Sequence, residues 1–244
     1  RDTTAVVAKQ FLHEIDALGI VYHAPFVDFA TSRNAALDLA ASLPDAPEFL
    51  LTMSADEVVS QGPALRAYLQ ARRESNEDIF CVEMRQRLQD LEIAWAIPRV
   101  IRTGSSWQYE GKIHEQLVDP VGDRSYYLRT GEDSPLRAPC RITHSATDDP
   151  RRAARARDRD IPLIEEALAV KPGDARLTIL LAQTYEGMAA AATDKAVASV
   201  YASKVMELYQ QAAGGKGDEA LYARMKYLNC AQQTGGLTPI ELLQ

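Results

Sequence analysis

The sequence predicts an α/β domain at residues 1–149, followed by an all-α domain of helical hairpins at residues 150–244. In the first part, segments with helical spacing of apolar residues alternate with short apolar runs, an order typical of a sheet covered by helices. In the second part every segment has helical spacing, and the breaks between segments are rich in Gly, Pro and Asp. With 46% hydrophobic and 25% charged side chains among 244 residues, the chain can bury a substantial core.

The first five elements follow a βαβ-like order, which predicts a mostly parallel sheet in this stretch. Gly19 is expected to cap the end of the first helix, Ser32 to cap the start of the second, and Pro63 to open the third. Pro44 and Pro47 break the chain before the next strand. The expected elements are a helix at 6–18, a strand at 20–22, a helix at 32–43, a strand at 49–53 and a helix at 64–73.

Four further strands, in mixed order, complete the predicted α/β domain. Gly104-Ser105-Ser106 forms the turn between the second and third of these strands. Residues 121–139 combine Gly, Pro and polar side chains, which predicts a mobile loop that acts as a lid. The strands are expected at 79–84, 95–102, 107–118 and 141–144, so the complete sheet should be mixed.

The second domain is predicted to contain about two helical hairpins. Leu180–Tyr185, followed after a turn by Lys195-Ala196, resembles the tetratricopeptide (TPR) pattern, in which a helix with small residues and Tyr pairs with a second helix. Two hairpins are fewer than the roughly three repeats that a free-standing solenoid needs, so the hairpins should pack on the first domain. The helices are expected at 151–169, 175–191, 195–213 and 219–233.

The charge distribution argues against a nucleic-acid partner. Residues 1–150 carry 15 Lys+Arg and 23 Asp+Glu, a balance of −8, and residues 151–244 carry 12 and 11, a balance of +1. Nucleic-acid binders concentrate positive charge, because they displace counterions from phosphates. No run approaches the roughly 18 apolar residues of a membrane helix, so no transmembrane segment is expected. Three widely spaced cysteines without a Cys-x-x-Cys pair predict a reduced, cytoplasmic protein.

Three motifs carry the functional signal. Ser54-Ala55-Asp56-Glu57 follows an apolar strand, where α/β sheets place cations and phosphates. The stretch Asp28–Leu37 lies upstream, and Tyr109–Glu115 lies downstream. Together they resemble the family-2 glycosyltransferases of GT-A architecture, with a Rossmann-type mixed sheet, and in particular the subgroup whose catalytic domain runs into helical repeats.

The resemblance implies a metal-dependent, hexosyltransferase-like enzyme that uses a nucleotide diphosphate sugar as donor, and a UDP-sugar is expected. A divalent cation, Mn²⁺ or Mg²⁺, would neutralise the leaving diphosphate. Asp56 is the expected metal ligand and His144 the second, because neutral imidazole suits Mn²⁺. Family members carry an acid where this chain has Ser54, so the expected metal affinity is weaker. The donor-binding residues implied by the resemblance are Asp28, Arg33, Asn34, Ser54 and Asp56.

Glu115 is the residue expected to act as general base. An inverting transferase needs one group to take the proton of the acceptor as it attacks, and a carboxylate within hydrogen-bond reach suffices. In a regular strand His114 would point to the opposite face, so its expected role is support of the base or contact with the acceptor. Because helical repeats present concave surfaces to peptides, a protein or peptide acceptor is expected.

Other interpretations of the same residues stay open. Asp56 and Glu57 also suit a polar turn, His144 a structural histidine, and Ser32-Arg33-Asn34 a helix cap with a solvated arginine. Arg99 and Arg102 suit either phosphate or neighbouring carboxylates. For the whole chain, the first alternative is a catalytically inactive transferase that acts as a binding or scaffold module through its repeats. The second is an enzyme that hydrolyses or transfers a nucleotide.

The resemblance also implies that the family's first nucleotide-binding strand precedes this chain. Family members place an Asp-Gly-Ser-Thr-Asp-like loop after that strand, and Arg1-Asp2-Thr3-Thr4 corresponds to the end of such a loop. Part of the uridine pocket would then lie before residue 1.

Overall fold

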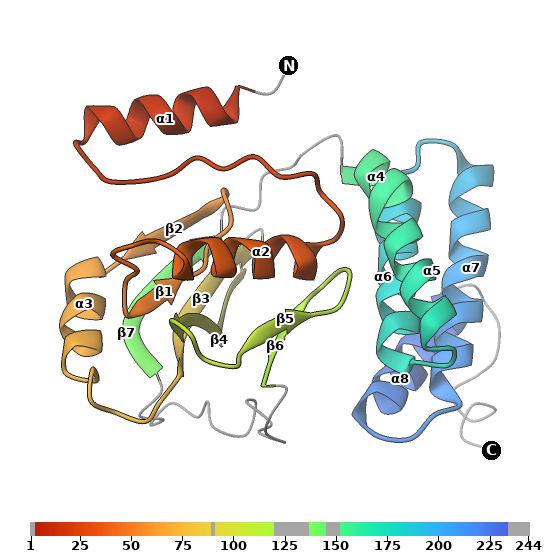
Figure 1. Cartoon of the computed structure of the whole chain (residues 1–244). Helices are drawn as coiled ribbons and strands as arrows, with labels where there is room; N and C mark the ends of the chain where they lie inside the picture. Colours follow the sequence, from red (N-terminus) through yellow and green to blue (C-terminus); the bar gives the residue numbers. More distant parts are fainter. Residues whose placement is uncertain (1–2, 89–90, 120–136, 145–151, 234–244) are drawn as a thin grey trace.

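The α/β domain of the computed structural model is built on one mixed, curled five-stranded sheet (Figure 1). The structure describes residues 3–88, 91–119, 137–144 and 152–233, so most of the expected lid at 121–139 lies outside the described residues. The strand order is β1-β4-β3-β7-β2. The strands are β1 (Phe49–Leu51), β2 (Glu57–Ser60), β3 (Ile79–Leu88), β4 (Leu91–Arg102) and β7 (Arg137–His144).

The mixed sheet is confirmed, but the expectation of mostly parallel pairing is wrong. Only β3 and β7 pair in parallel, whereas β1–β4, β3–β4 and β2–β7 are antiparallel. The chain between β3 and β4 is only residues 89–90, and a parallel pair needs a crossover of about a dozen residues or more. The neighbouring strands β3 and β4 are therefore restricted to an antiparallel hairpin.

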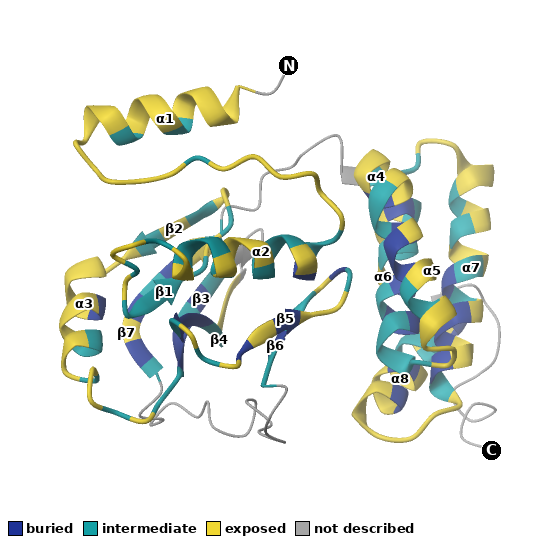
Figure 2. Cartoon of the chain, viewed as in Figure 1, coloured by how far each residue is buried: buried dark blue, intermediate teal, exposed yellow. Residues whose placement is uncertain are grey.

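Two layers cover the faces of the sheet. On one face, Ala30 and Leu37 of α2 (Phe29–Ala41) pack with Trp107, Tyr109 and other residues of the sheet and of a small hairpin. On the other face, α3 (Gly62–Gln70) contributes Leu65 to a core formed by β3, β4 and β7. Figure 2 shows the buried positions along these strands.

The small hairpin replaces the single strand expected at 107–118. Its strands β5 (Gln108–Glu110) and β6 (Gln116–Val118) are antiparallel. The turn between them holds Gly111 at φ 101° and His114 at φ 50°, backbone conformations that cannot continue a strand. The motif residues from Gly111 to Glu115 therefore belong to a turn, and strand alternation does not set the directions of His114 and Glu115.

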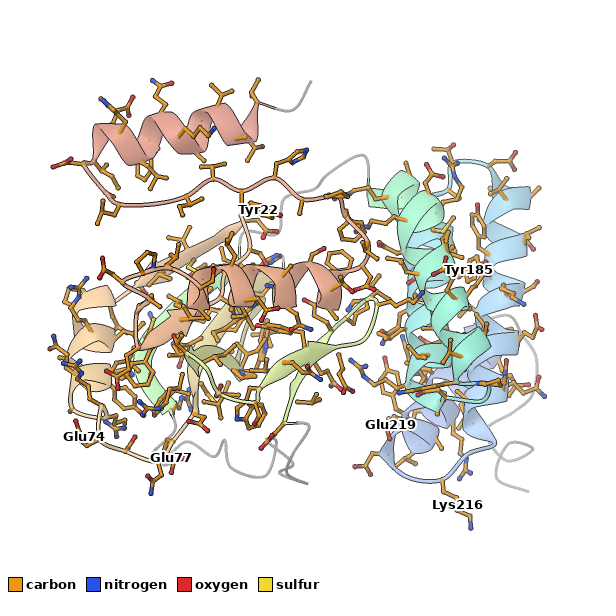
Figure 3. All side chains as sticks on the ribbon, in the orientation of Figure 1. Tyr22, Glu74, Glu77, Tyr185, Lys216 and Glu219 are labelled. Atoms are coloured by element: carbon orange, nitrogen blue, oxygen red, sulfur yellow. The ribbon has the colours of Figure 1, made fainter. Side chains whose placement is uncertain are left out.

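The N-terminal stretch departs furthest from its expected form. The helix α1 (Thr4–Glu14) ends before Leu18, because Asp16 adopts a left-handed backbone conformation at φ 50°. Residues 17–28 form neither helix nor strand, so the strand expected at 20–22 is not present. No residue of α1 is buried, and Tyr22, labelled in Figure 3, is 65% exposed. The apolar side chains of α1, such as Val6, Val7 and Phe11, recur with the spacing of a buried helix face, yet they are exposed.

The helical domain stands beside the sheet, with two of its helices at the expected bounds (Figure 1). The first expected helix divides into α4 (Arg152–Arg155), a π-helical turn (Ala156–Asp160) and α5 (Ile161–Val170). Pro162 explains the division, because its ring clashes with the carbonyl four residues earlier. The remaining helices are α6 (Ala175–Ala191), α7 (Lys195–Ala213) and α8 (Asp218–Gln233).

The tip of the β5–β6 hairpin joins the two domains. Ile113 is 5% exposed and belongs to the core cluster of the helical domain. Lys112 Nζ lies 2.5 Å from a carboxylate oxygen of Glu166, and Arg176 Nη2 donates to the His114 carbonyl at 2.9 Å. The helical hairpins therefore pack on the α/β domain through the same turn that carries the Glu115 motif.

Candidate functional site

The turn between β1 and β2 organises the candidate site. At its start the Thr52 N–H donates to the Arg99 carbonyl at 2.8 Å. At its end the Ser54 N–H donates to Glu57 Oε2 at 2.7 Å, and the Glu57 N–H donates back to the Ser54 carbonyl at 3.2 Å. The last two bonds close a turn at residues 54–57. Residues 52–57, which connect the two outer strands β1 and β2 of the sheet, are called the 52–57 turn below. Asp56 projects outward from it with a side chain that is 53% exposed.

Arg33 connects its own motif to Glu115, which lies 82 positions later in the sequence. Its Nε atom forms a salt bridge with Glu115, and its Nη2 atom donates to Ser54 Oγ at 3.3 Å. Both charged side chains are mostly enclosed, at 22% and 12% exposure. The guanidinium also lies over the Tyr109 ring, 5.3 Å from its centroid, as in a cation–π contact. Arg33, Ser54 and Glu115, all predicted site residues, therefore form one cluster.

Tyr109 anchors this cluster to the framework. Its hydroxyl lies 2.8 Å from Thr52 Oγ1, which belongs to the 52–57 turn. Asn34 holds the backbone of Tyr109 on both sides, because Asn34 Nδ2 donates to its carbonyl at 2.9 Å and Asn34 Oδ1 accepts from its N–H at 2.8 Å. The amide of Asn34, predicted to bind the donor, thus braces the hairpin. Thr52 and Tyr109 were not predicted as site residues, although Tyr109 begins the Tyr109–Glu115 motif and Thr52 lies two residues before Ser54.

A second pair lies on the other side of the 52–57 turn. Asp56 Oδ2 is 3.0 Å from His144 Nε2, although the residues are 88 positions apart. The antiparallel register of β2 and β7, which pairs Glu57 with His144, brings them together. The two residues expected to hold the metal are therefore neighbours, and both are open to solvent, at 53% and 31% exposure.

Glu57 and Arg99 form a buried ion pair beneath the turn. Arg99 Nη2 lies 2.6 Å from Glu57 Oε1, and the side chains are only 9% and 3% exposed. This contact decides between the two partners left open for Arg99, in favour of a neighbouring carboxylate. Arg102 also pairs with a carboxylate, since its Nη1 atom lies 2.8 Å from Glu48 Oε1. The sequence signal for Arg99 was a charge within a buried strand, which requires a partner.

The start of α2 differs from its expected form. Asp28, not Ser32, is the N-cap, and its Oδ1 accepts from the Thr31 N–H at 2.7 Å. Asp28 has the extended backbone that a cap needs, whereas Ser32 lies within the helix and donates to the Asp28 carbonyl at 2.7 Å. Arg33 and Asn34 therefore lie past the first turn, where backbone N–H groups are already bonded. They contribute side chains, and not a helix terminus, to the site.

His114 lies in the hairpin turn at the contact with the helical domain. The pKa of His114 is lowered, because desolvation disfavours its charged form and Arg176 repels it. The neutral imidazole is therefore favoured beside Glu115.

A cleft of about 520 Å³ lies between the two domains. Its α/β wall includes Asp28, Asn34 and Tyr109, and its helical wall includes Lys171 and Leu177. Asn34 and Tyr109 thus line this cleft and also support the Arg33–Glu115 cluster. The volume falls in the range of small-ligand sites.

The metal donors are few. Among the described residues, no group of three or more His, Cys, Asp or Glu side chains is placed to hold a metal ion. Because Mg²⁺ prefers oxygen ligands, one carboxylate and one imidazole fit a softer divalent cation such as Mn²⁺ that takes its remaining ligands from bound phosphate and water. Asp56 and His144 fit a cation of this kind.

Comparison with protein-family models and with curated proteins yields no match to this chain. No helix within the described residues has the length and apolar character needed to cross a membrane.

Proposed function

We propose that this chain is a metal-dependent, inverting glycosyltransferase of the family-2, GT-A type. It would transfer a sugar from a nucleotide diphosphate sugar, UDP-linked, to a nucleophile on a protein or peptide. One observation carries the proposal: the 52–57 turn has the Arg33–Ser54–Glu115 cluster on one side and the Asp56–His144 pair on the other. Five predicted site residues from distant parts of the sequence are thereby gathered around one loop.

Glu115 is proposed as the general base. Arg33 orients its carboxylate, and the stacked Tyr109 ring restricts Arg33 in turn. A carboxylate held in this way can accept the acceptor's proton while the nucleophile attacks the anomeric carbon from the face opposite the leaving group. His114, neutral and adjacent, is proposed to contact the acceptor.

Asp56 and His144 would hold the divalent cation, with Ser54 bonding to the ribose or to a metal-bound water. The cation, when bound, supplies positive charge that neutralises the leaving diphosphate. Two protein ligands suit a cation that arrives with its nucleotide, so metal and nucleotide should bind together.

The cleft between the domains is proposed to bind the part of the acceptor next to the reacting group, because its lining includes Gln116 but not Glu115 itself. Its helical wall gives the TPR-like domain a direct part in recognition, and its mixture of charged and apolar side chains suits a peptide segment. The TPR-like and GT-A assignments remain part of this proposal.

A binding or scaffold module is the second candidate, favoured by Ser54 in the position of a family acid and by the two-donor metal site. In that case restoring the acid would create no turnover.

Isothermal titration tests the proposal. UDP and a panel of UDP-sugars are titrated into the full-length protein with and without Mn²⁺, for wild type, Asp56→Ala and the exposed control Asp45→Ala. The expected result is Mn²⁺-dependent binding that only Asp56→Ala abolishes. Absence of nucleotide binding by the wild type would overturn the proposal and leave the scaffold function.

A further inference from the structure

Arg99 holds the 52–57 turn at both of its ends. Its carbonyl accepts from the Thr52 N–H at 2.8 Å, and its side chain reaches Glu57 at 2.6 Å. Thr52 and Glu57 are the first and last residues of the turn. A single position on β4 therefore fixes the span of the loop that carries Ser54 and Asp56.

We infer that Arg99 is a positioning residue, which acts through Glu57 to hold Asp56 against His144 and Ser54 against Arg33. This inference rests on the proposed function for its consequence in catalysis, but its geometric part stands by itself. Glu57 uses both carboxylate oxygens, one for Arg99 and the other for the Ser54 N–H. Displacement of the Glu57 carboxylate would therefore release the Ser54 N–H, next to the residue pair Glu57–His144 of the β2–β7 ladder.

The hydrogen bonding of Arg99 supports a geometric role over a purely stabilising one. Among the contacts of the described residues, the side chain of Arg99 has one partner, Glu57, and its Nε atom is buried without any. A buried ion pair with an unsatisfied donor contributes little net stability, because desolvation offsets the attraction. The pair nevertheless sets a distance and a direction within a site where small displacements matter.

Arg102 provides a matched control on the same strand. It pairs with Glu48 at 2.8 Å and donates to the carbonyls of Arg72 and Ser75. These contacts tie β4 to Glu48, just before β1, and to the connection after α3, and none of them involves the 52–57 turn. Replacement of Arg102 should therefore destabilise the domain without changing the site.

The test uses Arg99→Met, Arg99→Lys, Glu57→Gln and Arg102→Met in the full chain. The first readout is the imidazole NMR signal of His144, recorded without metal and assigned among the four histidines with His144→Gln. The second is Mn²⁺ affinity in the presence of UDP, and the third is the thermal midpoint. Because Arg99 contacts Glu57 through one nitrogen, a lysine at position 99 should keep this ion pair, whereas a methionine should remove it.

Arg99→Met and Glu57→Gln are expected to shift the His144 signal and to weaken Mn²⁺ binding by about 10- to 100-fold, as loss of the supports of a metal ligand commonly does. Arg99→Lys and Arg102→Met should leave the His144 signal and the Mn²⁺ affinity unchanged. If Arg99→Met does not fold, Glu57→Gln carries the test. An unchanged His144 signal in Glu57→Gln, or an equal shift in Arg102→Met, would overturn the inference. A shift of the His144 signal in Arg99→Met and Glu57→Gln but not in Arg102→Met, in a protein that binds no UDP, would support the inference and overturn only the proposed function.

Discussion

Ser54 limits how much charge the 52–57 turn can offer to a cation. Its hydroxyl accepts a long hydrogen bond of 3.3 Å from Arg33, and its backbone N–H is already used by Glu57. The side chain thus has a neutral oxygen at a position where a carboxylate would lie beside Arg33 and two residues from Asp56.

The variant Ser54→Asp should bind Mn²⁺ more tightly, by roughly tenfold, because affinity for hard cations rises with the number of charged oxygen ligands. Isothermal titration with UDP present measures the change. Ser54→Ala is the matched control and should show no gain. Equal affinities in Ser54→Asp and wild type would mean that position 54 does not face the cation.

Glu115→Gln should reduce sugar transfer by roughly 10²- to 10⁴-fold while nucleotide affinity stays near that of wild type, since an amide cannot accept the acceptor's proton. Glu74→Gln, an exposed change in the connection after α3, should have no effect. The measurement is product formation at saturating donor. Loss of nucleotide affinity in Glu115→Gln would instead place Glu115 in the donor site.

At the scale of elements, β3 and β7 are joined by charges as well as by their ladder. Glu83 on β3 accepts from Arg85 at 2.6 Å, from Arg141 at 2.9 Å and from Arg137 at 3.0 Å. The pKa of Glu83 is lowered from its ordinary value near 4.5, chiefly by the hydrogen bond from Arg85 and further by that from Arg141, against the opposing effect of desolvation. Two of these three arginines, Arg137 and Arg141, lie on β7, so the ionised carboxylate of Glu83 helps to join the parallel pair of strands.

The lowered pKa of Glu83 predicts a pH effect on stability. Because the folded state has the lower pKa, the contribution of Glu83 is complete above about pH 4.5 and is lost as the pH falls through the folded-state value. Urea unfolding should show Glu83→Gln about 1 kcal/mol less stable than wild type at pH 7, with a smaller difference at pH 3. The exposed Glu74, which points away from the α3–β3 connection in Figure 3, offers Glu74→Gln as the control. A constant difference at both pH values would contradict the linkage.

At the scale of the whole molecule, the two domains share one turn. Ile113 is inserted into the core of the helical domain, two residues from Glu115. Phe29, at the start of α2, packs against the same core, and Arg159 lies 4.9 Å above its ring. The position of the proposed base is therefore coupled to the docking of the helical domain.

Ile113→Ala should destabilise the protein by about 2–5 kcal/mol, because it removes a buried side chain and leaves a cavity at the domain contact. Thermal unfolding measures the loss, and hydrogen exchange of residues 108–118 should increase as the hairpin loosens. Ile93→Ala, at a position that is 38% exposed on β4, should change stability by no more than about 0.5 kcal/mol. Unchanged exchange in Ile113→Ala would mean that the hairpin is held by the sheet alone.

Helix positions in the second domain were predictable, because they depend on local signals. Asp174 and Asp194 cap α6 and α7 by accepting from the N–H groups of Leu177 and Ala196, and these helices have the predicted bounds. Periodicity did not reveal the strand partners, since antiparallel and parallel strands have the same alternation. It also gave no sign of the hairpin turn at Gly111 to Glu115, where two left-handed residues interrupt a strand-like pattern.

The sequence by itself determined that the chain forms a mixed α/β domain followed by helices, and which polar motifs are candidates for a site. Only the tertiary structure decided which of those motifs meet. The salt bridge of Arg33 with Glu115 and the contact of Asp56 with His144 each join residues more than 80 positions apart. Such contacts depend on strand register and on the packing of α2 against the hairpin, and neither is encoded within a short window of sequence.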